Sequence, residues 1–495
     1  MRGFNARLIV HILGLLLLFN SLFMGVATLS SFFMKDGATL GLVKALLVCL
    51  TVGGIAMGLT KNHKKEIKKR EGYLIVVFGW LTMVVFGTLP YLFSNSISSL
   101  SDAFFETMSG YTATGATIIN DIESLPKSII LWRSLTHWMG GMGIIVLAIA
   151  ILPLLGIGGM QLFSAEAPVI GGDKLHPRIS DTAKRLWLIY VSLTAANALL
   201  LILSGMPIFD AINHGMSTMA SGGFSTKNAS MGHWNDIPQI QYVTVFFMFL
   251  AGSNFVLLYY AIKGNFKRVF SDTEFRWYAG FIGAFVLIVM LSILKQEVFV
   301  APEISTWSAL EQSFRHALFQ VVAVISTTGL VTADFTAWSP FVTMLFFGLM
   351  FLGGSTGSTS GGVKVMRHLI LIKNGFLEFK RALHPNAILM VRLNKVTIEQ
   401  SIVYHVLAFF ILYMILFIIG AGVFSVLGLD FTTSIGVSAT SLGNIGPGLG
   451  VLDPTNTFAS LPVLGKWWSA LLMLLGRLEL FTVLILLTPY YWRKH

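Results

Sequence analysis

Four short loops rich in glycine, serine and threonine carry the residues of this sequence that are best suited to bind an ion. Each loop follows a short segment that is less apolar than the long runs around it, and each contains a glycine. Rings of backbone carbonyl oxygens replace the hydration shell of an alkali cation in selective pores. The four loops therefore predict a cation selectivity filter, one quarter from each loop. The expected filter residues are Ala113, Thr114 and Gly115; Ala220, Ser221 and Gly222; Thr327, Thr328 and Gly329; and Asn444, Ile445 and Gly446.

The loops recur at regular intervals, as expected for a repeated structural unit. If Gly115, Gly222, Gly329 and Gly446 are equivalent, the intervals are 107, 107 and 117 residues. Close helix packing through small residues is the alternative explanation of a glycine in a membrane protein. It does not explain why a glycine follows a short segment in all four units. It stays open for glycines within the long apolar runs, namely Gly140, Gly141, Gly252 and Gly476.

The composition places the chain in a membrane. Of its 495 residues 55% are hydrophobic and 12% charged, and the mean hydropathy is +0.76, more apolar surface than a soluble core can cover. The net charge of +11 comes from short basic runs beside apolar segments, which orient a membrane protein and do not indicate a nucleic-acid partner. Cys49 is the only cysteine, so an intrachain disulfide and a cysteine-based metal site are excluded.

The order of segments predicts an all-α membrane fold with ten spanning helices and four re-entrant pore helices. We expect an N-terminal hairpin (1–71), then four units related by pseudo-fourfold symmetry: 72–160, 161–270, 271–395 and 396–495. Each unit consists of a spanning helix, a short segment, a loop and a second spanning helix. The second helices are expected at 129–155, 239–262, 339–372 and 467–489.

Positive charges give the topology independently. Basic residues concentrate on one side of the ten helices, and by the positive-inside rule that side, with both termini, is cytoplasmic. All four short segments then enter from outside. The basic runs are 61–70, Lys174 to Arg185, Lys263 to Arg276, Lys364 to Lys395, and Arg493 with Lys494.

The short segments are too short to cross the bilayer. Residues 103–110 form about two helical turns and include Glu106, whereas a span needs about 20 apolar residues. The irregular loop that follows is tolerated at membrane depth only where it lines a water-filled path or is buried in protein. A half-helix that points its carboxyl end inward also directs a negative dipole end at a cation.

With these motifs the chain resembles the Trk/Ktr/HKT potassium transporter superfamily, and most closely its bacterial Trk membrane subunits of the TrkH type. The resemblance covers essentially the whole chain. It rests on Thr112-Ala-Thr-Gly-Ala-Thr117, His137-Trp-Met-Gly-Gly-Met-Gly-Ile144, Gly353-Gly-Ser-Thr-Gly-Ser-Thr-Ser-Gly-Gly-Val-Lys364, Asn444-Ile-Gly-Pro-Gly448 and Gly476-Arg-Leu-Glu479.

The resemblance implies potassium uptake across the bacterial inner membrane by a homodimer in which each protomer has its own pore. It also implies a cytoplasmic ring of TrkA-type regulatory subunits that binds the nucleotide, so this chain needs no cofactor and potassium is its substrate. The glycine at Gly115 favours potassium, because a serine there accompanies sodium preference in related plant transporters. In the fourth loop Asn444 and Ile445 replace the Ser or Thr before the glycine, which indicates a less regular filter and modest discrimination against sodium.

Two features are candidates for a gate. Residues 353–362 contain only glycine, serine and threonine, and such a stretch weakens a helix by about 1 kcal/mol per glycine. An unwound intramembrane loop is expected there, although a softened continuous helix stays open. Arg477 lies near the middle of a spanning segment, where a charge is costly. It either pairs with an acid such as Glu479 or faces the pore and bonds the carbonyls of the loop. The expected gate residues are Gly353, Gly354, Ser355, Thr356, Gly357, Ser358, Thr359, Ser360, Gly361, Gly362 and Arg477.

Two other functional classes are disfavoured. A secondary transporter for another small cation or solute usually has inverted repeats, whereas the charges give all four units the same orientation. An intramembrane enzyme is disfavoured because protease motifs are missing and the histidines show no common ligand spacing. The basic stretch 364–395 is a candidate contact for the regulatory ring or for anionic lipid headgroups.

Overall fold

The computed structural model describes residues 5–61, 69–143, 179–300, 306–387, 389–394 and 396–493. Regular structure within these residues is helical, apart from a hairpin of two short strands, β1 (Arg392–Leu393) and β2 (Val396–Thr397). Several sequence predictions fall outside the described residues: most of the basic run 61–70, Lys174, Arg178, Lys395, Lys494, the helix expected at 129–155 beyond residue 143, and the boundary at 160/161.

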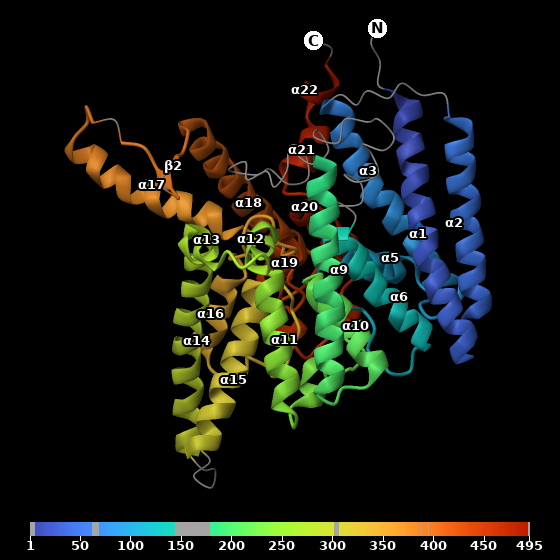
Figure 1. Cartoon of the computed structure of the whole chain (residues 1–495), viewed down its shortest axis with the longest axis horizontal. Helices are drawn as coiled ribbons and strands as arrows, with labels where there is room; N and C mark the ends of the chain where they lie inside the picture. The colour runs from blue at the N-terminus through green and yellow to red at the C-terminus, as the bar shows by residue number, and fades with distance from the viewer. Residues whose placement is uncertain are drawn as a thin grey trace.

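The N-terminal hairpin consists of two long apolar helices, α1 (Ala6–Met34) and α2 (Thr39–Leu59). They cross closely at two glycines: a Cβ atom on Gly53 would lie 3.0 Å from the carbonyl oxygen of Gly14. Helix α1 also packs on α3 and α6, so the hairpin covers one side of the first unit (Figure 1).

Four units follow the hairpin. The first contains α3 (Lys69–Gly87), α4 (Leu89–Phe93), α5 (Leu100–Tyr111), α6 (Lys127–Trp138) and the π-helical turn η1 (Met139–Gly143). The second contains α9 (Ile179–Leu203), α10 (Ile208–Met219), η2 (Ser230–Trp234), α11 (Pro238–Ala251), α12 (Phe255–Ile262) and α13 (Phe266–Ser271). The third contains α14 (Thr273–Val300), α15 (Thr306–Ile325), α16 (Pro340–Leu349), α17 (Val365–Leu383) and the β-hairpin. The fourth contains α18 (Gln400–Val426), α19 (Phe431–Gly443), η3 (Gly450–Leu452), η4 (Phe458–Ser460), α20 (Val463–Arg477), α21 (Phe481–Leu487) and α22 (Pro489–Trp492).

The pore helices α5, α10, α15 and α19 occupy the same place in each unit. Helix α5 has 12 residues and is therefore about 18 Å long, well short of the roughly 30 Å hydrocarbon core. Each pore helix packs between the first and second helices of its own unit. Contacts of α6 with α10, of α11 with α15, of α17 with α18 and of α20 with α5 join neighbouring units. Since α20 belongs to the last unit and α5 to the first, the units close into a ring.

The second helix of every unit is interrupted. Gly141 in η1 has a non-helical backbone, α11 and α12 are bent by 111° at Gly252 to Asn254, and α20 and α21 by 116° at Leu478 to Leu480. The spans predicted at 239–262 and 467–489 are therefore each two helices joined at a sharp bend and not one unbroken helix. In the third unit residues 350–364 separate α16 from α17, where the sequence predicts an unwound loop.

Within the described residues, six helices are long and apolar enough to span a membrane, or up to eight if each bent pair counts as one span. The other two predicted spans are the second segments of units 1 and 3. The range predicted for the first of these, 129–155, runs past residue 143, where the described part of the chain stops. The second, 339–372, is split by the loop 353–362. The start of α1, helix α22, helix α17 and the β-hairpin lie toward the same end of the molecule (Figure 1).

Candidate functional site

Each pore helix ends on the same uncommon backbone conformation. A non-glycine residue with a left-handed backbone follows the helix, and a glycine with positive φ follows two residues later. Left-handed geometry at this point ends a helix but is unusual for residues other than glycine and asparagine. The first residues are Ala113 (φ 50°), Ser221 (φ 55°), Thr327 (φ 53°) and Asn444 (φ 53°); the glycines are Gly115 (φ 84°), Gly223 (φ 82°), Gly329 (φ 67°) and Gly446 (φ 104°).

This pattern corrects the predicted equivalence in the second unit. Gly223, not Gly222, has the positive φ and lies two residues after the left-handed residue. The second quarter of the site is therefore Ser221, Gly222 and Gly223, and Ala220 only ends helix α10. The sequence did not distinguish the two positions because both are glycine and their intervals differ by one residue.

The four glycines form a closed circle of contacts with their neighbours' carbonyl groups. A Cβ atom on Gly115 would lie 2.2 Å from the carbonyl oxygen of Gly222, and one on Gly223 would lie 2.3 Å from that of Thr328. Side chains do not tolerate separations this short, so only glycine fits. The other two contacts continue the circle. A Cβ atom on Gly329 would lie 1.9 Å from the carbonyl oxygen of Ile445, and one on Gly446 would lie 2.7 Å from that of Thr114. The four predicted loops therefore meet around one axis.

The loop 353–362 lies directly against the left-handed residues of three units. Thr359 Oγ1 is 2.9 Å from Ser221 Oγ, and the Gly361 amide donates to Thr327 Oγ1 at 2.6 Å. A Cβ atom on Gly361 would lie 2.8 Å from Asn444 Cβ. The structure thus brings the predicted gate residues to one side of the predicted filter.

The loop folds back on itself and on the interrupted helix of the second unit. The Gly353 amide donates to Val363 O (2.8 Å), and the Val365 amide donates to Gly354 O (3.1 Å). The Ser355 amide donates to Gly252 O at 2.8 Å. These bonds satisfy backbone groups that lipid could not satisfy, among them the carbonyl group of Gly252, the residue that follows α11.

Arg477 connects this loop to the first unit. Its guanidinium donates to the carbonyl oxygens of Thr359 and Gly141, both at 2.8 Å, and also to Gly140 O. Glu479 forms its ion pair with Arg367 on α17. Arg477 therefore bonds a carbonyl group of the loop, and Glu479 pairs with Arg367.

One residue that contacts the loop has no signal in the sequence. Glu274, at the start of α14, is buried with 3% of its surface exposed. Its Oε1 atom accepts hydrogen bonds from the amides of Thr356 (2.7 Å) and Met366 (3.1 Å), one within the loop and one just after it. The contacts span 82 and 92 positions of the chain, so no local pattern indicates them.

The described residues contain no group of three or more His, Cys, Asp or Glu side chains that could hold a metal ion. The atoms that close the circle between the loops are uncharged backbone carbonyl oxygens. Such oxygens suit a monovalent cation that passes through and do not suit a tightly held transition metal.

Comparison with known proteins gives a consistent result. Residues 41–494 match the family described as TrkH, cation transport protein. The chain is 41% identical over 491 residues to "Trk system potassium uptake protein TrkH" of Salmonella typhimurium, covering 99% of both chains. It is 35% identical to "Trk system potassium uptake protein TrkG" of Escherichia coli over 494 residues, again covering 99% of each.

A solved structure agrees over the whole length. The crystal structure of the potassium transporter TrkH from Vibrio parahaemolyticus aligns with a TM-score of 0.87 at 39% identity, covering 99% of this chain and 100% of that one. The predicted fold class, a helical membrane protein with pore-loop repeats, is confirmed.

Replacing Glu274 tests its contact with the loop. Glu274→Ala removes the acceptor of two amides, and one such hydrogen bond contributes about 1 kcal/mol. We expect amide hydrogen exchange in residues 354–366 to become at least about fivefold faster. Glu274→Gln is the matched control, because its side-chain oxygen can still accept both bonds. Equal exchange in both variants would contradict the assignment.

Proposed function

The chain belongs to the TrkH family of cation transport proteins, and from that premise we propose that it takes up potassium across the bacterial inner membrane. The observation that carries the proposal is the closed circle of contacts from Gly115 through Gly223 and Gly329 to Gly446. A transport protein of this family is not an enzyme, and potassium is its substrate.

In this proposal the carbonyl groups of Thr114, Gly222, Thr328 and Ile445 form one ring of the filter. Each lies against the glycine of the preceding unit, which supports their placement around a common axis. Such a ring coordinates a dehydrated potassium ion. All four pore helices end at this ring, an arrangement that disfavours a solute transporter built from inverted repeats.

The fourth quarter differs from the others and supports a less regular filter. The Asn444 side chain donates to Thr114 Oγ1 (3.0 Å) and to Met473 O (2.9 Å). In the first and third units two hydroxyls beside the filter pair with each other, Thr112 with Thr114 and Ser326 with Thr328, each pair 2.8 Å apart. The equivalent residues of the fourth unit, Gly443 and Ile445, have no hydroxyl group. We propose that this asymmetry makes discrimination between potassium and sodium modest.

The proposed gate is the loop 353–362 held by Arg477. The loop lies against Ser221 and Thr327, where it obstructs one side of the ring. Arg477 holds it through Thr359 O, so loss of this bond favours displacement of the loop. The inside-negative membrane potential then drives potassium inward with about 2.3 kcal/mol per charge per 100 mV.

The proposal also covers the assembly around the chain, which we infer from membership of the family. We propose a homodimer, with both termini in the cytoplasm and a TrkA-type nucleotide-binding ring beneath it. Basic residues of α17 and the strand that follows are candidates for contact with the ring or with lipid headgroups. The proposed division of the chain keeps the hairpin 1–71 and four units with boundaries at 160/161, 270/271 and 395/396.

Potassium uptake is tested with Gly115→Ser. A side chain at Gly115 meets Gly222 O, so the ring must distort. The assay uses a bacterial strain without its own potassium uptake, in which we expect the unmodified chain to take up radioactive rubidium. We expect the rate of uptake to be at least about tenfold lower in the variant, equivalent to 1.4 kcal/mol. Gly280→Ser on α14 is the control, because nothing lies within 4 Å of a Cβ there. No uptake by the unmodified chain would contradict the proposed function.

The gate is tested with Arg477→Ala. A charged hydrogen bond contributes about 1.5 kcal/mol or more, so its loss should raise passive potassium flux in proteoliposomes about tenfold. Arg477→Lys, which keeps the charge but has one donor group, should give an intermediate flux. Flux that is unchanged in Arg477→Ala would show that the arginine does not hold the pore closed.

A further inference from the structure

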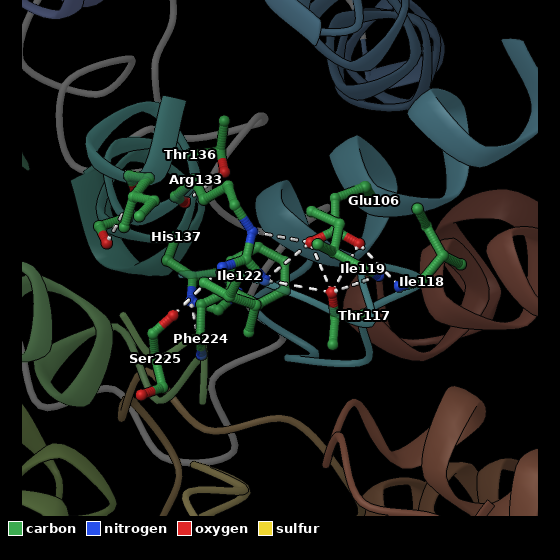
Figure 2. Close-up of polar contacts among 12 residues, drawn as sticks. Glu106, Thr117, Ile118, Ile119, Ile122, Arg133, Thr136, His137, Phe224 and Ser225 are labelled. Atoms are coloured by element: carbon green, nitrogen blue, oxygen red, sulfur yellow. Dashed lines mark hydrogen bonds and ion pairs between the residues drawn. The ribbon is translucent and has the colours of Figure 1, made fainter. Parts of the chain in front are cut away.

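Beside the filter, away from the loop 353–362, Glu106 and Arg133 form a fully buried ion pair. Glu106 lies on pore helix α5 and Arg133 on α6, and their exposed fractions are 0% and 1%. Arg133 Nε donates to Glu106 Oε1 at 2.8 Å. Two charges at this depth are costly unless every polar group has a partner, and Figure 2 shows that the surrounding groups supply those partners.

The carboxylate binds the segment that follows Gly115. Both oxygens of Glu106 accept from the Thr117 hydroxyl, at 2.9 and 3.0 Å, and Oε2 accepts from the Ile118 amide at 3.0 Å. Thr117 Oγ1 in turn accepts from Arg133 (3.2 Å) and from the Ile119 amide (3.1 Å). The pair therefore fixes the chain two to four residues after the filter glycine.

The guanidinium extends the same network to the second unit. Arg133 donates to Ser225 O at 3.2 Å and lies 4.1 Å from the centre of the Phe224 ring. His137, one turn further along α6, stacks on that ring at 3.9 Å. Phe224 and Ser225 directly follow Gly223, so Arg133 links the first and second filter loops (Figure 2).

The same position of the pore helix is used differently in the other units. Nine residues before each filter glycine stand Glu106, His214, Gln320 and Val437. His214 Nε2 is 3.0 Å from Ser225 Oγ, and Gln320 donates to Thr332 Oγ1 (3.3 Å) and Ala333 O (3.1 Å). Val437 is apolar and buried. Among these four residues Glu106 alone has an acidic side chain, and its partner Arg133 reaches the second filter loop at Ser225.

We propose that Glu106 and Arg133 are positioning residues that set the discrimination between potassium and sodium by fixing the first two filter loops relative to each other. The inference rests on the proposed function, since it concerns the selectivity of the same filter. Selectivity of a carbonyl ring depends on how many oxygens face the ion and how firmly they are held. A charge-assisted network with all partners present holds them more firmly than the neutral contacts of the other units.

Two variants alter the network without leaving a buried charge unpaired. The double variant Glu106→Gln/Arg133→Gln removes both charges together, which avoids the large penalty of an isolated charge. Arg133→Lys keeps the pair but loses the forked contact with Glu106, Thr117 and Ser225. The matched control is Glu311→Gln/Arg315→Gln. That ion pair lies on pore helix α15 at 2.9 Å, and Arg315 donates to Asn235 O and Gln241 Oε1, outside the filter loops.

The readout is the ratio of the sodium and potassium concentrations that half-inhibit rubidium uptake into proteoliposomes. A ratio does not depend on the fraction of folded protein, so a merely structural defect leaves it unchanged. We expect this ratio to fall about tenfold in the double variant, which is the effect of losing one charged hydrogen bond. In Arg133→Lys the ratio should fall less, and in the control it should stay unchanged.

The outcomes separate the two proposals. A ratio in the double variant equal to that of the unmodified protein overturns the inference, as does an equal fall in the control. If the unmodified protein takes up no rubidium, the proposed function fails instead. A variant without measurable uptake is tested in detergent by the rise in Tm that sodium or potassium causes. The ratio of the sodium and potassium concentrations that give a half-maximal rise then supports or overturns the inference in the same way.

Discussion

Each pore loop approaches its neighbour so closely that only glycine fits at the point of contact. Four such contacts, from Gly115, Gly223, Gly329 and Gly446 to the carbonyl group of the next loop, close into a circle. Because each contact requires both a left-handed backbone and the absence of a Cβ atom, the circle fixes where all four pore helices end. The packing of α20 from the last unit on α5 of the first closes the same circle at the level of helices.

The circle of contacts leaves backbone polar groups at membrane depth, where water is not available to bond them. The remaining polar features of the structure supply hydrogen-bond partners for these groups. The interrupted second helices supply free carbonyl oxygens, and Arg477 and the loop 353–362 bond to those of Gly140, Gly141 and Gly252. On the other side, Glu106 and Arg133 bond the segments that leave the first two loops. The ring of four loops therefore has the loop 353–362 on one face and a buried ionic network beside it.

The sequence predicted the parts of this arrangement that have a local signal. A glycine after each short segment, the Gly/Ser/Thr stretch 353–362 and the isolated Arg477 each stand out against apolar surroundings. The predicted equivalence of Gly222 with the other filter glycines is wrong, because the adjacent Gly222 and Gly223 fit the interval between the loops equally well. The breaks after Ala251 and Arg477 were missed although Gly252-Ser253-Asn254 and Glu479 stand there. So few polar residues barely lower the mean hydropathy of a span-length window, which therefore stays apolar while the backbone turns. Glu274 and the Glu106–Arg133 pair act through partners distant in sequence, and no spacing rule identifies such partners.

The most direct test of the account is to locate rubidium in crystals of the protein by anomalous diffraction. The account predicts a peak on the axis of the ring, surrounded by the carbonyl oxygens of Thr114, Gly222, Thr328 and Ile445. Rubidium bound only away from this axis, with no peak between the four loops, would contradict it.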